Sequence, residues 1–126
     1  MNTVLAIALG GGFGAATRHY AILLVTQLFG QDFPYGTLFV NVLGSFLIGA
    51  ILETLALKYD LPLEIKAFLV TGFLGGFTTF STFSLDVFKL AETGAYVSSI
   101  VYVLSSVLIS IMAIFLAVYI VRGVVN

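Results

Sequence analysis

The chain has 126 residues, of which 60% are hydrophobic and only 9% are charged, with a formal net charge of -1. A water-soluble domain carries roughly 25% charged residues, so this composition cannot cover a water-facing surface, but it suits a surface that faces lipid. The near-neutral charge implies no polyanionic partner, and the sequence has no basic stripe for nucleic acid. The absence of cysteine excludes disulfides and thiolate chemistry, and a single histidine cannot form a histidine metal cluster.

Four apolar segments are each long enough to cross a bilayer, which takes about 20 residues. We expect them to form transmembrane helices at roughly Thr3 to Phe29, Tyr35 to Leu57, Glu64 to Leu90 and Ala95 to Val121. The connections are short, so consecutive helices should be antiparallel neighbours. The whole chain, residues 1–126, is therefore predicted to be a single all-α membrane domain.

The third segment contains a sequence that disfavours a continuous helix. Gly75 and Gly76 directly precede a run of hydroxyl side chains and phenylalanines that extends from Phe77 to Ser84. Adjacent glycines weaken a helix, and serine and threonine compete for its backbone groups. We predict that the third helix is broken in the middle of the membrane, where the carbonyls that the break frees could coordinate a cation.

Glycines are spaced four apart in the first and third segments, as Gly10 with Gly14 and Gly72 with Gly76. This spacing favours close packing between helices, because two backbones can approach where side chains are small. Arg18, in the first segment, is interpreted as a structural anchor rather than a transport residue.

Polar residues recur every four positions on two of the predicted helices, which places each set along one helix face. The two faces could line a track of hydroxyl and amide donors without a buried carboxylate, which suits an anion or a neutral solute. Alternatively, the hydroxyls bond the carbonyls four residues earlier or join helices, although the amide of Asn41 is costlier to bury. The sets are Thr37, Asn41 and Ser45, and Tyr102, Ser106 and Ser110.

Phe77, Phe80 and Phe83 are spaced three apart beside the predicted break. Core packing is the ordinary explanation for such residues. Alternatively, their electropositive ring edges point at an anion, and spacing alone does not decide between the two. Glu53 and Asp86 lie near helix ends and are expected only to face water.

Basic residues are divided almost evenly between the two ends of the predicted bundle. With both termini on one side, that side holds Lys58, Lys66 and Arg122, and the other side holds Lys89 and Arg18. The positive-inside rule sets orientation through an excess of basic residues on one side of the membrane. This chain has almost no such excess, so either orientation could insert. A four-helix unit is also small for enclosing a polar path alone, so we expect a homo-oligomer, and an antiparallel dimer is compatible with the weak bias.

Three runs of the sequence resemble the Fluc fluoride channels, also called CrcB proteins. They are Gly72-Phe73-Leu74-Gly75-Gly76-Phe77-Thr78-Thr79-Phe80-Ser81-Thr82-Phe83-Ser84, then Tyr35-Gly36-Thr37-Leu38-Phe39-Val40-Asn41, and Gly11-Gly12-Phe13-Gly14-Ala15-Ala16-Thr17-Arg18. The resemblance covers the whole chain in length and in the order of its segments. It implies an antiparallel, dual-topology homodimer in the cell inner membrane, with two pores that export fluoride passively and no enzymatic activity.

The resemblance also implies roles for individual residues. The backbone carbonyls of Gly75 and Thr78, from both subunits, would hold a central structural Na⁺, and Arg18 would match the helix-one arginine of the family. The fluoride pathway would be formed by Thr37, Asn41, Phe80, Phe83, Ser81, Thr82, Tyr102, Ser106 and Ser110.

Two other kinds of membrane protein compete with a channel. A small proton-coupled multidrug transporter also has four helices, but it needs a titratable carboxylate deep in the membrane, normally in its first helix. The first predicted helix of this chain contains no aspartate or glutamate. A structural subunit without transport activity would leave the polar stripes and the broken helix without a purpose.

Overall fold

The computed structural model describes residues 2–125, and its regular structure over that range is entirely helical. Four long helical segments follow one another along the chain. The first is α1 (Thr3–Phe29) and the second is α2 (Tyr35–Leu57). The third consists of α3 (Leu63–Lys66), the π-helical η1 (Ala67–Leu74), α4 (Gly75–Phe77) and α5 (Phe80–Glu92), and the fourth is α6 (Tyr96–Val125). The all-α prediction and the four predicted segments are confirmed to within a few residues.

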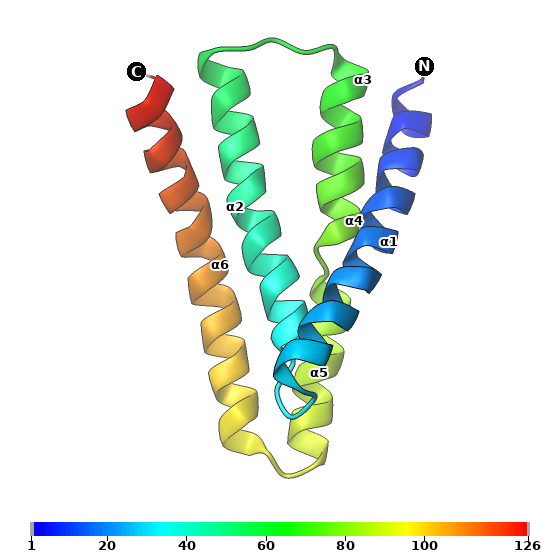
Figure 1. The fold of residues 1–126 in the computed structure, drawn as a ribbon, viewed down its shortest axis with the longest axis vertical. Coiled ribbons are helices and arrows are strands. Elements are labelled where there is room, and N and C mark those ends of the chain that lie inside the picture. The colour runs from blue at the N-terminus through cyan, green and yellow to red at the C-terminus, as the bar shows by residue number, and fades with distance from the viewer. Residues whose placement is uncertain (1, 126) are drawn as a thin grey trace.

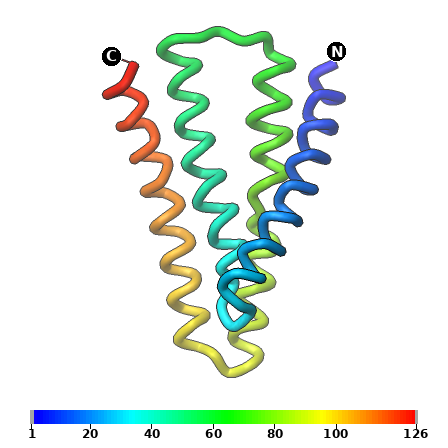
Figure 2. The backbone as a smooth tube through the Cα atoms, in the orientation of Figure 1, coloured from blue at the N-terminus to red at the C-terminus, as the bar shows by residue number. Residues whose placement is uncertain are grey.

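The four segments form an open V (Figure 1). One arm consists of α1 with the α3–α4 part of the third segment, and the other consists of α2 with α6. Both described ends of the chain and the α2–α3 connection lie at the open end, as the tube also shows (Figure 2). The α1–α2 and α5–α6 connections lie toward the opposite end, so the predicted antiparallel succession is confirmed.

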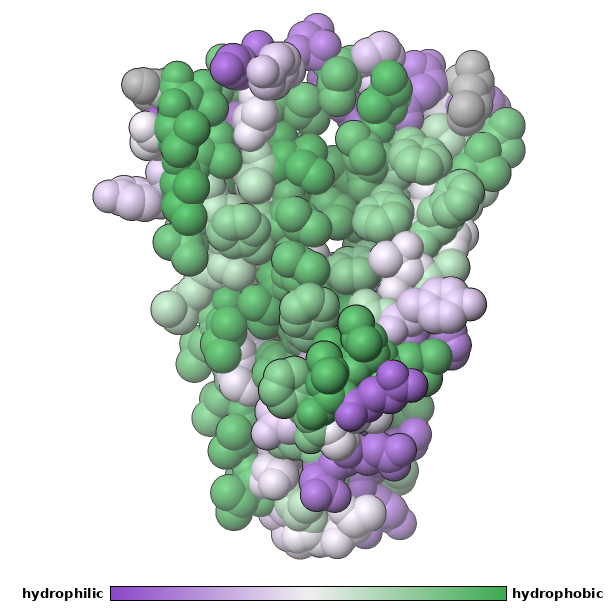
Figure 3. Space-filling view, in the orientation of Figure 1, coloured by the Kyte–Doolittle hydropathy of each residue, from purple (hydrophilic) through white to green (hydrophobic). Residues whose placement is uncertain are grey.

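Three segments are long and apolar enough to cross a membrane, namely Tyr35–Leu57, Leu63–Glu92 and Tyr96–Val125. Helix α1 is similarly long, at 27 residues, but its glycines and the Arg18-His19-Tyr20 sequence make it less apolar. The chain is therefore a multi-pass membrane protein, and α1 as a fourth span remains a prediction. Figure 3 shows apolar side chains over the middle of the molecule and hydrophilic ones gathered toward its two ends.

Local sequence explains where α1 begins and ends. The Asn2 side chain accepts hydrogen bonds from the backbone N–H groups of Val4, at 2.6 Å, and Leu5, at 3.4 Å, and so satisfies donors that have no partner within the helix. The helix ends at Gly30, whose φ of 89° is open to glycine without strain. These two residues set the length of α1 and the direction of the loop that follows it.

Glycines bring α1 into backbone contact with the third segment. A methyl group added at Gly10 or Gly14 would collide with a backbone carbonyl oxygen of η1. A methyl group added at Gly72 or Gly76 would press on a carbonyl oxygen of α1, at 2.9 and 2.5 Å respectively. The predicted close packing through these four glycines is confirmed, and it fixes one arm of the V.

This contact predicts different outcomes for two glycines of the same helix. Gly14→Ala should lower the free energy of unfolding by about 1–3 kcal/mol, because the backbones must separate to admit the methyl group. Gly12→Ala is the control, since nothing lies within 4 Å of its added carbon, and it should be neutral or stabilising by about 0.5–1 kcal/mol. Denaturant unfolding in detergent micelles measures both, and equal destabilisation by the two variants would contradict the packing argument.

Candidate functional site

The third segment breaks at Thr78 and Thr79, between α4 and α5. Both residues have extended backbones, with φ and ψ of -90° and 159° at Thr78 and of -155° and 117° at Thr79. The Thr79 hydroxyl accepts a hydrogen bond from the Thr82 N–H at 3.1 Å and so caps the start of α5. The predicted helix break is confirmed, and the hydroxyl run that predicted it also supplies the cap that restarts the helix.

Asn41 of α2 replaces hydrogen bonds that the break removes. Its Oδ1 accepts a hydrogen bond from the Thr79 N–H at 2.7 Å, and its Nδ2 donates one to the Thr79 carbonyl at 3.0 Å. Gly44, three residues further along α2, leaves space for the Thr78 methyl group, which a side chain there would meet. Because an amide carries two N–H groups, one N–H of Asn41 remains available to a ligand.

Arg18 reaches the same break from α1. Its Nη1 donates a hydrogen bond to the Thr78 carbonyl oxygen at 3.3 Å, and the contact is partly buried. The bond ties α1 to the break, as the predicted anchoring role requires. The neighbouring Gly75 carbonyl loses its usual helical partner, because the Thr79 N–H four residues later donates to Asn41 instead.

A cleft of about 370 Å³ opens beside the break, between α2, α5 and α6. Its walls carry hydroxyl, amide, phenyl and aliphatic groups, and no charged side chain is among the described residues that line it. Ser45 and both threonines of the break contribute to the wall. Five residues of the predicted fluoride pathway also meet there: Asn41, Phe80, Phe83, Ser106 and Ser110.

Two serine hydroxyls on the α6 wall of this cleft are free. The Oγ atoms of Ser106 and Ser110 are buried, and residues 2–125 provide neither with a hydrogen-bond partner. The adjacent Ser105 instead donates to the Val101 carbonyl at 2.7 Å, which is the arrangement that the alternative explanation of the stripe required. A buried hydroxyl without a partner is costly, which makes Ser106 and Ser110 the candidates for a bond to a ligand in the cleft.

The three phenylalanines beside the break have different environments. Phe77 is buried and its ring stacks on that of Phe73 at 6.1 Å, which is ordinary core packing. Phe80 is 77% exposed and Phe83 is buried, yet both line the cleft, and their ring centroids lie 5.6 Å apart. The packing explanation therefore holds for Phe77. Phe83 both lines the cleft and packs on Tyr102, with centroids 5.1 Å apart, and the pathway roles of Phe80 and Phe83 stay predictions.

The polar track continues beyond the cleft to Tyr102 and Thr37, both of which are buried. The Tyr102 hydroxyl donates a hydrogen bond to Asp86 Oδ2 at 3.0 Å, and Thr37 lies next to that hydroxyl. The expectation that Asp86 only faces water is wrong, because its carboxylate is half-buried beside the Tyr102 hydroxyl. The tight α5–α6 connection places Asp86 opposite Tyr102, a pairing that the spacing within one helix does not reveal.

The expectation that Glu53 only faces water is also wrong. Its side chain is 17% exposed, and its Oε1 lies 2.8 Å from Nε of Arg122. The pair joins α2 to α6 near the open end of the V, far along both helices from the cleft. It therefore serves packing between these helices and not the polar track.

Ser81 and Thr82 do not reach the wall of the cleft. Ser81 is exposed, and its Oγ lies 3.4 Å from the Thr79 hydroxyl. Thr82 contributes its backbone N–H to the cap of α5. Their predicted place in the pathway is not supported by the geometry of this chain and stays a prediction.

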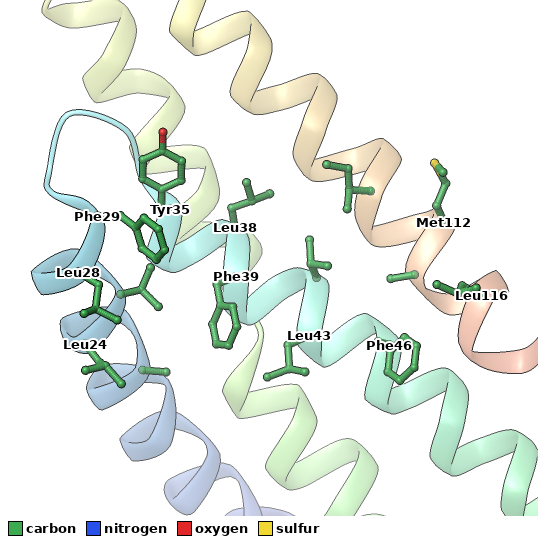
Figure 4. A pocket seen from close by; sticks show the side chains of 15 residues that line it. Leu24, Leu28, Phe29, Tyr35, Leu38, Phe39, Leu43, Phe46, Met112 and Leu116 are labelled. Atoms are coloured by element: carbon green, nitrogen blue, oxygen red, sulfur yellow. The ribbon is translucent and has the colours of Figure 1, made fainter. Parts of the chain in front are cut away.

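A second hollow is larger than this cleft and is apolar. An apolar groove of about 1230 Å³ lies between α1, α2 and α6 (Figure 4). Its wall consists of aliphatic and aromatic side chains such as Leu24, Phe39 and Met112, with the Tyr35 hydroxyl directed away at one end. A small ion would lose its water there without gaining donors, so size does not make this groove the candidate site.

Sequence reasoning missed several residues that build the site. Thr79 is the centre of the break, and a hydroxyl residue directly before a new helix is the signal that could have identified it as a cap. Gly44 could have been suspected because it lies three residues after Asn41, on nearly the same helix face. The partner of Arg18 is 60 residues away, and no local pattern predicts such a contact.

Fold and site together define a multi-pass helical membrane protein with an uncharged, hydroxyl-bearing cleft beside a broken helix. Residues 5–118 match the family model described as CrcB-like protein, Camphor Resistance (CrcB). The chain belongs to this family, and the resemblance drawn from its motifs is confirmed.

Several relatives are similar over almost their entire length. A protein of Chelativorans sp. (strain BNC1) is 45% identical over 98% of this chain and 99% of its own. A protein of Granulibacter bethesdensis is 46% identical over 100% of this chain and 99% of its own. A protein of Rhizobium meliloti is 44% identical over 99% of this chain and 100% of its own. Each of the three is named a fluoride-specific ion channel FluC.

The Asn41 bonds predict a stability effect that is separate from any transport role. Asn41→Ala leaves the Thr79 N–H and carbonyl without partners, and we expect a loss of about 2–6 kcal/mol in the free energy of unfolding. Ser45→Ala, one turn away on the same wall, should change it by no more than about 0.5 kcal/mol. Denaturant unfolding in micelles compares the two, and a stable Asn41→Ala protein would show that the break does not depend on this amide.

Proposed function

We propose that this chain is a fluoride-selective ion channel that lets fluoride leave the cell passively across the inner plasma membrane. The observation that carries the proposal is the pair of buried, unpartnered hydroxyls of Ser106 and Ser110 in an uncharged cleft at mid-membrane. Membership of the CrcB family and the names of the relatives support the same conclusion. The protein is accordingly a transport protein and not an enzyme.

The chemistry of the cleft suits a small anion. Fluoride holds its hydration water strongly, so a selective path must offer donors in place of that water. Two serine hydroxyls and the spare Asn41 N–H are such donors, and the edges of the Phe80 and Phe83 rings add a weaker positive field. A fixed ammonium or guanidinium in the path would hold the ion too tightly to release it, and the described lining contains neither.

The functional unit in this proposal is an antiparallel, dual-topology homodimer with two pores. The cleft is open on one side, and Phe80 at its edge is 77% exposed, so a second copy would be needed to enclose an ion path. A two-fold axis repeats whatever one copy contributes, which gives two equivalent pores. The even division of basic residues between the two ends supports insertion in both orientations.

A structural Na⁺ at the centre of that dimer fits the residues at the break. The Gly75 carbonyl has lost its helical partner, and Gly75 is exposed on the surface of the chain. Together with the Thr78 carbonyl it gives two neutral oxygens per copy, which are suitable ligands for a hard monovalent cation. The Arg18 bond occupies one lone pair of the Thr78 oxygen and leaves the second available.

Purified protein in liposomes should release fluoride rapidly and release chloride far more slowly. The efflux should run down the fluoride gradient without a proton gradient, because the cleft contains no titratable side chain among its described residues. Ion-selective electrodes measure both fluxes. Comparable chloride efflux, or efflux that stops when the proton gradient is removed, would overturn the proposal.

The free serine hydroxyls predict a loss of flux without a loss of stability. Ser106→Ala removes a donor to the ion, and a hydrogen bond to a charged group is worth about 1.5–3 kcal/mol, so fluoride efflux should fall at least about tenfold. The thermal stability should not fall, since the hydroxyl has no protein partner among the described residues. Ser105→Ala is the matched control, and equal effects of the two substitutions on flux would exclude Ser106 from the path.

Crosslinking tests the assembly, because the chain has no cysteine of its own. Gly75→Cys should form a disulfide-linked dimer, since Gly75 is exposed and would lie at the axis. Gly123→Cys, also unobstructed, should not form one, because antiparallel subunits place their ends on opposite sides of the membrane. Crosslinking at both positions would indicate parallel subunits.

Replacing Na⁺ by N-methyl-D-glucamine should lower the melting temperature of the dimer, and an unchanged value would exclude the structural sodium ion.

A further inference from the structure

The loop between α1 and α2 carries one apolar side chain that turns inward. Gln31 and Asp32 are exposed, whereas Phe33 is half-buried. The loop is held tightly, because the Gly30 N–H donates to the Thr26 carbonyl at 2.8 Å and the Tyr35 N–H donates to the Phe33 carbonyl at 2.8 Å. The position of the Phe33 ring is therefore set by the backbone of the loop.

The Phe33 ring covers the end of the polar track. Its centroid lies 5.5 Å from that of Tyr102 with the ring planes at 83°, an edge-to-face contact. Phe83 packs on the same tyrosine, with centroids 5.1 Å apart. Tyr102 is 0% exposed, and the Phe33 ring, which comes from the α1–α2 loop, is one of the two phenylalanine rings that pack on it.

The Phe33 ring packs on the part of the track that lies beyond the cleft. Tyr102 lies eight residues before Ser110 on α6, which is about 12 Å along the helix axis toward the loop side. The cleft stops at Ser106 and Phe83, and its lining includes neither Tyr102 nor Thr37. Beyond the cleft, the track therefore continues through buried Tyr102 and Thr37 toward the end of the molecule that carries the α1–α2 loop.

We infer that Phe33 is the gate residue at the loop end of the fluoride path, an inference that rests on the proposed channel function. Its ring limits entry and exit at the point where the ion exchanges the Thr37 and Tyr102 hydroxyls for water. Because the backbone of the loop is held, opening this end needs only a rotation of the Phe33 side chain, without movement of α2, α5 or α6.

Cysteine labelling tests whether Phe33 covers the track. In the cysteine-free chain, Thr37→Cys is a single reporter, and the probe is a small cationic methanethiosulfonate reagent. Adding Phe33→Ala should raise the labelling rate at least about tenfold, because the site becomes open to water. Phe29→Ala is the matched control, since the Phe29 ring contacts Tyr35 at 5.7 Å and has no such contact with Tyr102. Phe33→Leu, which retains bulk, should label slowly.

Fluoride efflux from liposomes then tests whether the cover limits transport. In the chain with Thr37 intact, Phe33→Ala should raise efflux at least about twofold, whereas Phe29→Ala should leave it unchanged. Unchanged labelling, or faster labelling with unchanged efflux, would overturn the gate. Failure of the unsubstituted protein to pass fluoride would instead overturn the channel proposal, and the labelling result would still show whether Phe33 covers the track.

Discussion

The structure depends on one constraint, which is that backbone groups freed at mid-membrane need partners where water is absent. Breaking the third segment at Thr78 and Thr79 releases groups that a continuous helix would have paired. Asn41 supplies both partners for Thr79, and Arg18 supplies one for the Thr78 carbonyl. Two side chains from two other helices thus make an otherwise unfavourable backbone stable, and they do so at the place where the cleft opens.

The cleft follows from this arrangement and from close packing around it. Glycines let α1 press against η1, and Gly44 lets α2 approach the Thr78 side chain. The eight-residue π-helical stretch of η1 belongs to the same packed wall, and such stretches are frequent near functional sites. With the backbone held by Asn41 and Arg18, α5 restarts with Phe80 and Phe83 in the wall of the cleft that Ser106 and Ser110 of α6 also line. The Ser105 hydroxyl donates a hydrogen bond to the Val101 carbonyl. The hydroxyls of Ser106 and Ser110 have no such partner among the described residues and are left free.

The helices, the break and the glycine contacts could be predicted from the sequence because each depends on neighbours along the chain. Residues spaced four apart share a helix face whatever the tertiary structure, so the stripes containing Asn41 and Ser106 were also within reach. The pairing of Tyr102 with Asp86 and of Glu53 with Arg122 was not, because it depends on the relative height and rotation of two packed helices. The hydrogen bonds of Asn41 to the Thr79 backbone also depend on how two helices pack. The sequence therefore predicts Asn41 as a pore residue but does not predict these bonds.

The contacts at the break also have an order in time. Asn41 lies 38 residues before Thr79 and Arg18 lies 60 residues before Thr78, so both partners leave the ribosome earlier than the segment they stabilise. The side chains that pair with the break are therefore already synthesised when the third segment enters the membrane. The bond between Tyr102 and Asp86 needs α6, the last helix to be synthesised. A chain released before α6 would hold a completed break but would lack the α6 wall of the cleft, so the last helix to be synthesised completes the site within one copy.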